Sequence, residues 1–224
     1  MHTFEIEIKS LLGSQERRDA LLEKMRAIDP GLTLLSKNKQ LNHYFIGGDL
    51  QKLSASLLQF FSAEAQERLS NLVTIAKEFS IRTRDKDGKV LFIVKASVDD
   101  SSSANGVRRM EFEESVPLSL SDLDQKVLDA GFTYQAKWSR EREEYTVRDV
   151  SVCLDKNAGY GYLAEFEKMI TDESQVESAR DSILSLMKEL EVEELPQDRL
   201  ERMFAHYNAH WPEYFGTEKI FIIE

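Results

Sequence analysis

Apolar and charged residues alternate in several short stretches of the chain, a pattern typical of β-strands with one buried face. In residues 4–9, for example, Phe4, Ile6 and Ile8 alternate with charged side chains. Similar patterns predict further strands at residues 40–46, 79–84, 90–97 and 108–116, within 133–148, and at 151–155 and 161–170. Asp87-Gly88 is a hairpin turn signal between the third and fourth of these strands.

Apolar residues at helical spacing fill most of the intervals between the strands. Helices are predicted at residues 14–28, in two pieces within residues 49–78, at residues 121–130 and 173–191, and from Pro196 onward. The helix at 121–130 has Ser121 and Asp124 in capping-box spacing at its start and Gly131 beyond its end.

The prediction is a single domain that occupies residues 1–224, because no internal repeat, low-complexity block or linker divides the chain. Its parts are core strands at about residues 4–170, a helical insertion at 49–78 and a C-terminal helical extension at 173–224. Residues 99–106 form a loop by composition. The apolar tail at residues 219–223 is expected to add a short strand or to pack on the body.

Charged residues within the strands recur at every second position, so that they share a strand face. Glu5, Glu7 and Lys9 form the first such set, which alone is typical of an ordinary wet strand face. Like-charged pairs at this spacing occur five times, at Glu5/Glu7, Arg82/Arg84, Glu111/Glu113, Arg140/Arg142 and Glu165/Glu167. Such neighbours lie about 7 Å apart and repel one another unless a counter-charge is present.

The strand charges form an acidic group and a basic group. The acidic group is Glu5, Glu7, Glu111, Glu113, Asp155, Glu165 and Glu167. The basic group is Lys9, Arg82, Arg84, Lys95, Arg109, Arg140 and Arg142. Carboxylates without Cys or His suit Mg²⁺ or Mn²⁺, and guanidinium groups suit phosphate oxygens. A metal–phosphate ligand would neutralise both groups, although a ladder of salt bridges on a wet sheet explains the same pattern equally well.

Taken in order, these segments resemble the CYTH superfamily, also called triphosphate tunnel metalloenzymes, whose name comes from class IV adenylyl cyclases and thiamine triphosphatases. The resemblance covers about residues 4–170. It is carried by Glu-x-Glu-x-Lys at 5–9, QLNHYF at 40–45, Arg-x-Arg at 82–84, Lys95, Arg-x-Glu-x-Glu at 109–113, the run from Arg140 to Tyr145, and Asp155 followed by Gly161 and Glu165-Phe-Glu167. Departures are the long helical stretch at 49–78, Arg140 where Lys is common, and the helical tail after residue 172.

The resemblance implies an α+β fold, an eight-stranded antiparallel β-barrel around a triphosphate tunnel, with inserted and C-terminal helices. The basic group would bind a small-molecule triphosphate substrate. The acidic group would hold one or two Mg²⁺ or Mn²⁺ ions, with Glu5, Glu7, Glu165 and Glu167 as first choices. Lys9 would stabilise charge or assist proton transfer. Together with the metal ligands Glu5 and Glu7, Lys9 is expected to be catalytic.

The expected activity is divalent-metal-dependent hydrolysis of inorganic triphosphate, a nucleoside triphosphate or thiamine triphosphate. A class IV-type adenylyl cyclase, which makes cyclic AMP from ATP, is the second hypothesis. A non-catalytic polyphosphate- or nucleotide-binding module is the third, and the acidic group argues against it because phosphate binding alone needs no carboxylates.

Composition narrows the partners and the compartment. A net charge of −11 argues against nucleic acid or an anionic membrane as a partner. No apolar run approaches the ~18 residues of a membrane span, and the N-terminus lacks a signal-peptide pattern. Cys153 is the single cysteine, which suits a reducing cytoplasm. We expect a cytoplasmic monomer or homodimer.

Four further residues are expected to have structural roles. His43 is predicted to be a packed strand histidine, and Cys153 a small buried residue rather than a nucleophile. His206 and His210 stand at i,i+4 on a predicted helix, but no third ligand accompanies them, so surface or packing roles are expected.

Overall fold

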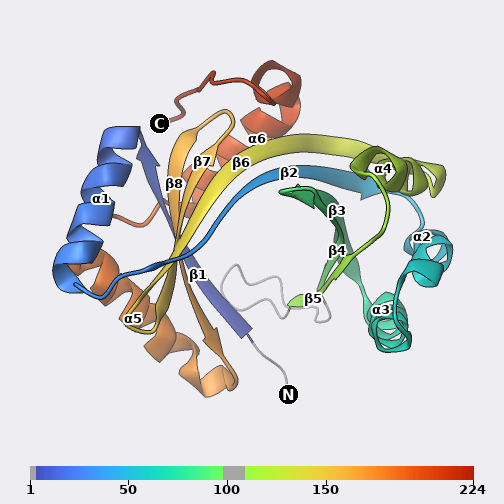
Figure 1. The fold of residues 1–224 in the computed structure, drawn as a ribbon, viewed down its shortest axis with the longest axis horizontal. Coiled ribbons are helices and arrows are strands. Elements are labelled where there is room, and N and C mark those ends of the chain that lie inside the picture. The colour runs from blue at the N-terminus through green and yellow to red at the C-terminus, as the bar shows by residue number, and fades with distance from the viewer. Residues whose placement is uncertain (1–3, 98–108) are drawn as a thin grey trace. The chain divides into compact units, whose positions relative to one another are not determined.

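Eight strands form one sheet in the computed structural model, which describes residues 4–97 and 109–224 (Figure 1). The side chains of Phe4, Glu5, Ser97, Arg109, Met110 and Glu173 are not among those described, and the loop predicted at 99–106 lies outside the described residues. The strand order is β1-β8-β7-β6-β2-β3-β4-β5. Every pairing with a described register is antiparallel, which confirms the predicted α+β fold.

The element bounds agree with most of the predicted ranges. The strands are β1 (Phe4–Gly13), β2 (Leu34–Gly47), β3 (Glu78–Lys86), β4 (Lys89–Ser97), β5 (Arg109–Ser115), β6 (Phe132–Val147), β7 (Val150–Asn157) and β8 (Gly161–Ile170). The helices are α1 (Gln15–Ile28), α2 (Leu50–Leu57), α3 (Ala63–Ile75), α4 (Leu120–Asp129), α5 (Val176–Glu189) and α6 (Gln197–Tyr214), with short 3₁₀ turns at Leu58–Phe60 and Glu173–Gln175. The two helices predicted within 49–78 are therefore confirmed, and β2 begins six residues before its predicted start at residue 40.

The contacts of the chain gather in two compact units. Unit 1 comprises Met1–Lys39 and Ser139–Glu224, and unit 2 comprises Gln40–Trp138. The long strands β2 and β6 contribute residues to both units. The single domain over residues 1–224 stays a prediction.

In unit 1, α1 and α5 pack on one face of β1 and β8 (Figure 1). Ile8, Val152 and Phe166 lie on this face and are buried against Met25 of α1 and Ile183 of α5. The alternation that buries these residues directs the charged residues of the same strands to the opposite face. The buried core of unit 1 therefore determines which way the charged groups point.

The C-terminal segment returns to the turn between β7 and β8. The amide of Phe221 donates to the Gly159 carbonyl at 2.6 Å, and Ile220 forms an isolated parallel bridge with Gly159. Gly159 has a φ of +87°, and a Cβ there would meet the Tyr207 ring at 2.6 Å, so both the backbone and the packing require glycine. The predicted packing of the tail on the body is confirmed.

Helix α6 begins close to its predicted start, and its two histidines make packing contacts. Pro196 is the N-cap of α6, one position before the first turn that was predicted for it. The rings of His206 and His210 stack with centroids 4.4 Å apart, and His206 also packs against Phe221. These are packing contacts, as expected from the sequence.

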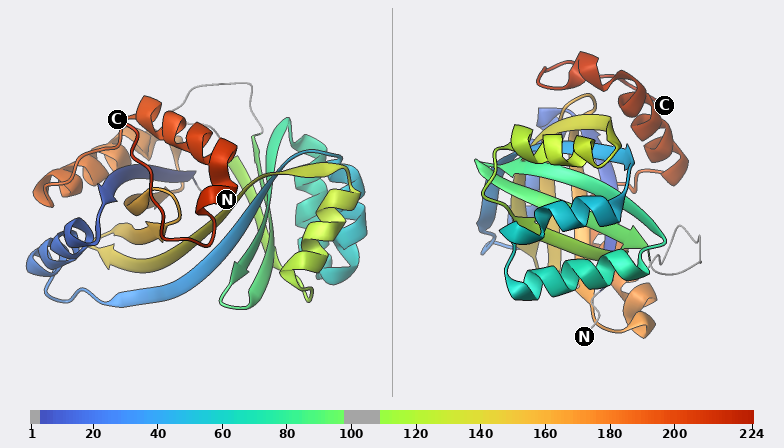
Figure 2. Two further views of the ribbon diagram at one scale, coloured as in Figure 1. Left: turned by 90° about the horizontal axis from the view of Figure 1, so that it is seen from above. Right: turned by 90° about the vertical axis from the view of Figure 1, so that its right-hand side faces the viewer.

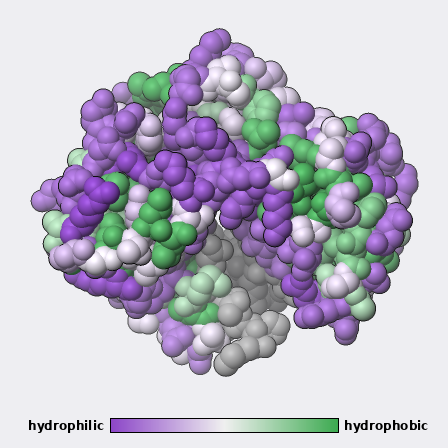
Figure 3. All heavy atoms as spheres, viewed as in Figure 1, coloured by the Kyte–Doolittle hydropathy of each residue, from purple (hydrophilic) through white to green (hydrophobic). Residues whose placement is uncertain are grey.

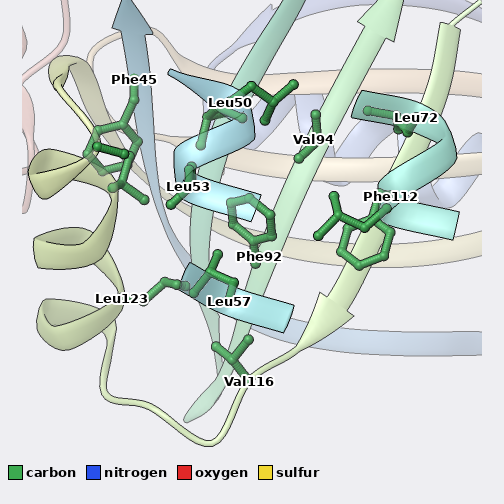
Figure 4. Packing of buried hydrophobic residues seen from close by; sticks show 14 of the residues in the cluster. Phe45, Leu50, Leu53, Leu57, Leu72, Phe92, Val94, Phe112, Val116 and Leu123 are labelled. Atoms are coloured by element: carbon green, nitrogen blue, oxygen red, sulfur yellow. The ribbon is translucent and has the colours of Figure 1, made fainter. Parts of the chain in front are cut away.

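In unit 2, helices α2, α3 and α4 cover the apolar face of the strands (Figure 2, right). Leu53 and Leu57 of α2 and Leu123 of α4 pack with Phe92 and Phe112 of the sheet (Figure 4). The β3–β4 hairpin turns at Asp87 and Gly88, with φ of 51° and 86°, the left-handed conformations that a two-residue type I′ turn requires.

Hydrophilic residues cover most of the face of the molecule shown in Figure 3. Charged residues make up 31% of the chain and supply much of this surface. Among the described residues, no helix is both long and apolar enough to cross a membrane.

The start of α4 corrects one prediction. Ser119, not Ser121, is the N-cap, and its Oγ accepts from the Asp122 amide at 3.1 Å.

Asp124, which was predicted to lie in the capping box, instead has a buried role in unit 2. It is buried and accepts hydrogen bonds from His43 Nδ1 at 2.6 Å, Thr83 Oγ1 at 2.6 Å and the Tyr134 hydroxyl at 2.7 Å. His43 is thus a packed strand histidine, as predicted.

Asp124 is expected to be a large contributor to the stability of unit 2. Burial tends to raise its pKa, but the hydrogen bonds from His43, Thr83 and Tyr134 outweigh burial and lower it. Asp124→Ala removes the acceptor of two buried donors, on His43 and Thr83, and of the half-buried Tyr134 hydroxyl. The free energy of unfolding should therefore fall by roughly 2–4 kcal/mol, measured by urea denaturation.

The matched control is Asp181→Ala, which removes an exposed helical aspartate in unit 1. It should change the free energy of unfolding by no more than about 0.5 kcal/mol. Equal effects of the two substitutions would contradict a role for the Asp124 hydrogen bonds.

Candidate metal and phosphate site

The strand register of unit 1 gathers charged side chains on one face of the sheet. Residues directly opposite each other in an antiparallel pair share a face. Glu7 lies opposite Glu167, and Lys9 lies opposite Glu165. Arg142 lies opposite Asp155, and Arg140 lies opposite Asn157. Seven of the predicted site residues are therefore brought together on this face: Glu7, Lys9, Arg140, Arg142, Asp155, Glu165 and Glu167.

Three carboxylates on this face form a close cluster. Glu7, Glu165 and Glu167 each offer an oxygen, and these oxygens lie within 4.8 Å of one another. An all-carboxylate set of this kind fits Mg²⁺ or Mn²⁺, which prefer hard oxygen ligands. Glu5 lies two residues before Glu7, with its backbone opposite Met169, and its side chain is outside the described set.

Asp155 interacts with arginines and is not part of the carboxylate cluster. Arg142 binds it through two hydrogen bonds, Nε to Oδ1 at 2.8 Å and Nη2 to Oδ2 at 2.7 Å. Arg140 Nη1 adds a contact to Oδ2 at 3.2 Å. The Asp155 side chain is fully buried, so this bidentate pairing holds both guanidinium groups in place.

Lys9 and Arg142 surround Glu165 with positive charge. Arg142 Nη2 donates to Glu165, and Lys9 Nζ lies 3.6 Å from it while also pairing with Glu7. Burial tends to raise the pKa of Glu165, but the charges of Lys9, Arg142 and Arg140 outweigh burial and hold the pKa well below its usual range. Glu165 is therefore ionised near neutral pH, as a metal ligand must be.

Cys153 lies on the same face of the sheet, directly opposite Glu165. Burial raises the pKa of its thiol to about 12, opposed by the Arg142 charge and assisted by nearby carboxylates. The thiol therefore stays protonated at neutral pH and is not a nucleophile. This agrees with the prediction of a small buried residue.

Unit 2 pairs its predicted acids and bases with one another. Lys95 Nζ lies 3.1 Å from Glu111, and Arg84 Nη1 lies 3.2 Å from Glu113. These contacts form the ladder of salt bridges that the sequence pattern left open. The close acidic cluster found among the described residues includes neither Glu111 nor Glu113.

Arg82 and Arg109 are the other two predicted bases of unit 2. The Arg82 guanidinium lies 4.6 Å from the centre of the Tyr44 ring, and its Nε is a buried donor without a hydrogen-bond partner in the part of the chain that the structure describes. Arg109 pairs with Ser97 through the β5 backbone, and its side chain is outside the described set.

The family model of the CYTH domain matches residues 75–199, which is more than half of the chain. The chain therefore belongs to the CYTH domain family, and the resemblance inferred from the sequence is confirmed. The match begins after β1, so the Glu-x-Glu-x-Lys segment lies outside it. No curated protein matches the chain.

Solved structures show the same fold at low sequence identity. A candidate adenylate cyclase from Vibrio parahaemolyticus is 16% identical, with a TM-score of 0.60, and the match covers 92% of this chain and 99% of that one. A Pyrococcus horikoshii protein is 19% identical, with a TM-score of 0.59 and coverage of 87% and 94%. A conserved hypothetical protein from Pyrococcus furiosus is 18% identical, with a TM-score of 0.58 and coverage of 85% and 92%.

One polar residue on the charged face of unit 1 was missed from the sequence. Asn157 ends β7, two residues after Asp155, and is 9% exposed. The spacing Asp-x-Asn in LDKN was a usable signal, because it places both side chains on one face. Asn157 is uncharged and therefore falls outside the pattern of alternating charges.

The charges around Glu165 predict a specific dependence of stability on pH. Because the folded-state pKa is lowered, the stabilising contribution of Glu165 is present above the ordinary carboxyl pKa of 4.5 and is lost as pH falls below it. The difference in free energy of unfolding between wild type and Glu165→Gln should therefore be constant near neutral pH and change between about pH 4.5 and pH 2. Urea denaturation at a series of pH values measures it. A difference that stays flat over that window would show that the neighbouring cations do not act on Glu165.

Proposed function

We propose that the chain is a divalent-metal-dependent phosphohydrolase acting on a triphosphate-containing substrate. The observation that carries the proposal is the cluster of Glu7, Glu165 and Glu167, whose oxygens lie within 4.8 Å of one another. Lys9 and Arg142 lie beside this cluster and can bind phosphate oxygens. Membership of a family named for class IV adenylyl cyclases and thiamine triphosphatases supports triphosphate chemistry.

In this proposal the carboxylates hold Mg²⁺ or Mn²⁺, with Glu5 as a further ligand from the same strand face. A bound ion of this kind neutralises phosphate oxygens and lowers the pKa of a coordinated water. Arg140 and Arg142 bind phosphate oxygens from the side of Asp155, which keeps their guanidinium groups oriented. Lys9 stabilises developing charge or moves a proton at Nζ.

The predicted residues of unit 2 have the same proposed roles. Arg82, Arg84, Lys95 and Arg109 are proposed to bind phosphate oxygens, and the unpartnered Nε of Arg82 supports this for one of them. Glu111 and Glu113 are proposed as further metal ligands. Each would have to exchange its lysine or arginine partner for the ion.

Adenylyl cyclase activity is the second candidate function. It is supported by the similar solved structure from Vibrio parahaemolyticus, which is described as a candidate adenylate cyclase. In that reaction the ribose hydroxyl of ATP attacks the α-phosphate and pyrophosphate leaves. The same cations and carboxylates would serve both reactions, so product identity separates them. A binding module without turnover has no need of the carboxylate cluster.

Glu7→Gln and Glu167→Gln should each lower metal-dependent hydrolysis of a triphosphate by about 100-fold or more, because each removes one charged ligand. Release of phosphate with Mg²⁺ and with Mn²⁺ measures the effect. A rise in melting temperature on adding Mn²⁺ should be seen in wild type and be absent in both variants.

Glu193→Gln is the matched control, because Glu193 is an exposed glutamate of unit 1 outside the site. It should retain wild-type turnover and the wild-type response to Mn²⁺. Full hydrolysis by Glu7→Gln and Glu167→Gln would refute the assignment of the metal ligands.

A panel of inorganic triphosphate, ATP and thiamine triphosphate, each with Mg²⁺ or Mn²⁺, should give phosphate from at least one substrate. Chromatography of the products distinguishes the candidate functions. Cyclic AMP and pyrophosphate from ATP would establish the cyclase instead, and binding of all three without any product would establish the binding module.

A further inference from the structure

Asn157 carries a buried hydrogen-bond donor that no group among the described residues satisfies. Its Nδ2 is buried and has no hydrogen-bond partner. The residue as a whole is 9% exposed, so solvent reaches little of it. Buried amide donors in folded proteins are almost always paired, because an unpaired one loses its bond to water without replacement. Such a donor on a charged face therefore points to a ligand.

The register places Asn157 on the same face as the charged site of unit 1. It lies directly opposite Arg140 on β6 and two residues after Asp155 on β7. On the other side it lies opposite Gly161 of β8, which has no side chain to offer as a partner. Its cross-strand neighbour Arg140 is one of the residues proposed to bind phosphate, while the opposite face of β7 packs in the apolar core.

The neighbouring acceptor, Asp155, is already engaged. Arg142 binds both of its oxygens at 2.8 Å and 2.7 Å, and Arg140 binds Oδ2 at 3.2 Å. Asp155 therefore orients the two arginines, and its oxygens do not accept a hydrogen bond from the Asn157 amide. Arg140, Arg142 and Asn157 thus carry donor groups close to one another on this face, which suits an anion rich in oxygen acceptors.

We infer that the Asn157 amide donates a hydrogen bond to a phosphate oxygen of the bound triphosphate, beside Arg140 and Arg142. Asn157 is thereby a substrate-binding residue of the site, and the inference rests on the proposed function. A neutral amide donor adds direction without adding charge, because it donates along its N–H bonds. Its contribution belongs to binding of the triphosphate and not to the chemical step.

Asn157→Ala should weaken binding of diimidotriphosphate (here called imidotriphosphate), a tripolyphosphate analogue in which NH replaces both bridging oxygens, by about tenfold in the presence of Mg²⁺. Isothermal titration calorimetry measures this without turnover. With hydrolysable tripolyphosphate, KM should rise by about the same factor while kcat stays within about threefold. Asn157→Asp keeps the shape of the side chain and should weaken binding further, because a carboxylate repels phosphate.

Asn71→Ala is the matched control, since Asn71 is an exposed helical asparagine of unit 2. It should bind imidotriphosphate as wild type does. Wild-type affinity in both Asn157 variants would overturn this inference and leave the proposed function standing, whatever their melting temperatures. A wild-type protein that neither binds imidotriphosphate nor hydrolyses any triphosphate would overturn the proposed function and this inference together.

Discussion

The structure of unit 1 depends on placing several charges on one partly buried sheet face without leaving any of them unpaired. A buried carboxylate or guanidinium group is costly unless an opposite charge and hydrogen bonds compensate it. Asp155, whose side chain is fully buried, meets this condition through Arg142 and Arg140. Glu165 meets it through Arg142 and Lys9. Arg142 contacts both Asp155 and Glu165, and Lys9 contacts both Glu7 and Glu165, so the network is connected and not a set of independent pairs.

The apolar face of the same strands fixes this network in place. Ile8, Val152 and Phe166 alternate with the charged residues and are buried against α1 and α5. A slip of one residue in the pairing of β1 with β8 would expose this core and bury the charges on the wrong side. The hydrophobic pattern therefore specifies the register, and the register brings Glu7 to Glu167 and Lys9 to Glu165. The chemistry of the site is a consequence of the packing behind it.

The sequence predicted the eight strands and most helices because period-2 and period-3.6 patterns are local properties. It also predicted which charged residues of unit 1 share a strand face, since i and i+2 share a face in any strand. Their role as a site stays a prediction. It did not predict the start of β2 at Leu34, because residues 34–39 do not alternate: both Leu34 and Leu35 are exposed there. It misplaced the cap of α4 because Ser119 and Ser121 are both plausible caps, and the backbone conformation decides between them.

Side-chain contacts between strands that are distant in the sequence could not be predicted from the sequence. The three donors that meet at Asp124 come from β2, β3 and β6, and nothing in the spacing of His43, Thr83 and Tyr134 connects them. Likewise, the sequence could not separate Asp155 from the other acids. Its role follows from lying opposite Arg142, whereas Glu165 and Glu167 lie opposite the residues of β1. Composition identifies the charges, and only the order of strands assigns their partners.

The same network explains how a charged site can exist before any ligand arrives. Lys9 pairs with Glu7 and Glu165, two members of the carboxylate cluster. A cation bound by these carboxylates would compete with Lys9 for them, because both are positive charges seeking the same oxygens. Lys9 would then exchange a carboxylate partner for a phosphate oxygen. Under the proposed function, the lysine that pairs with carboxylates in the protein alone is thus the group that would contact the phosphate when the ion is bound.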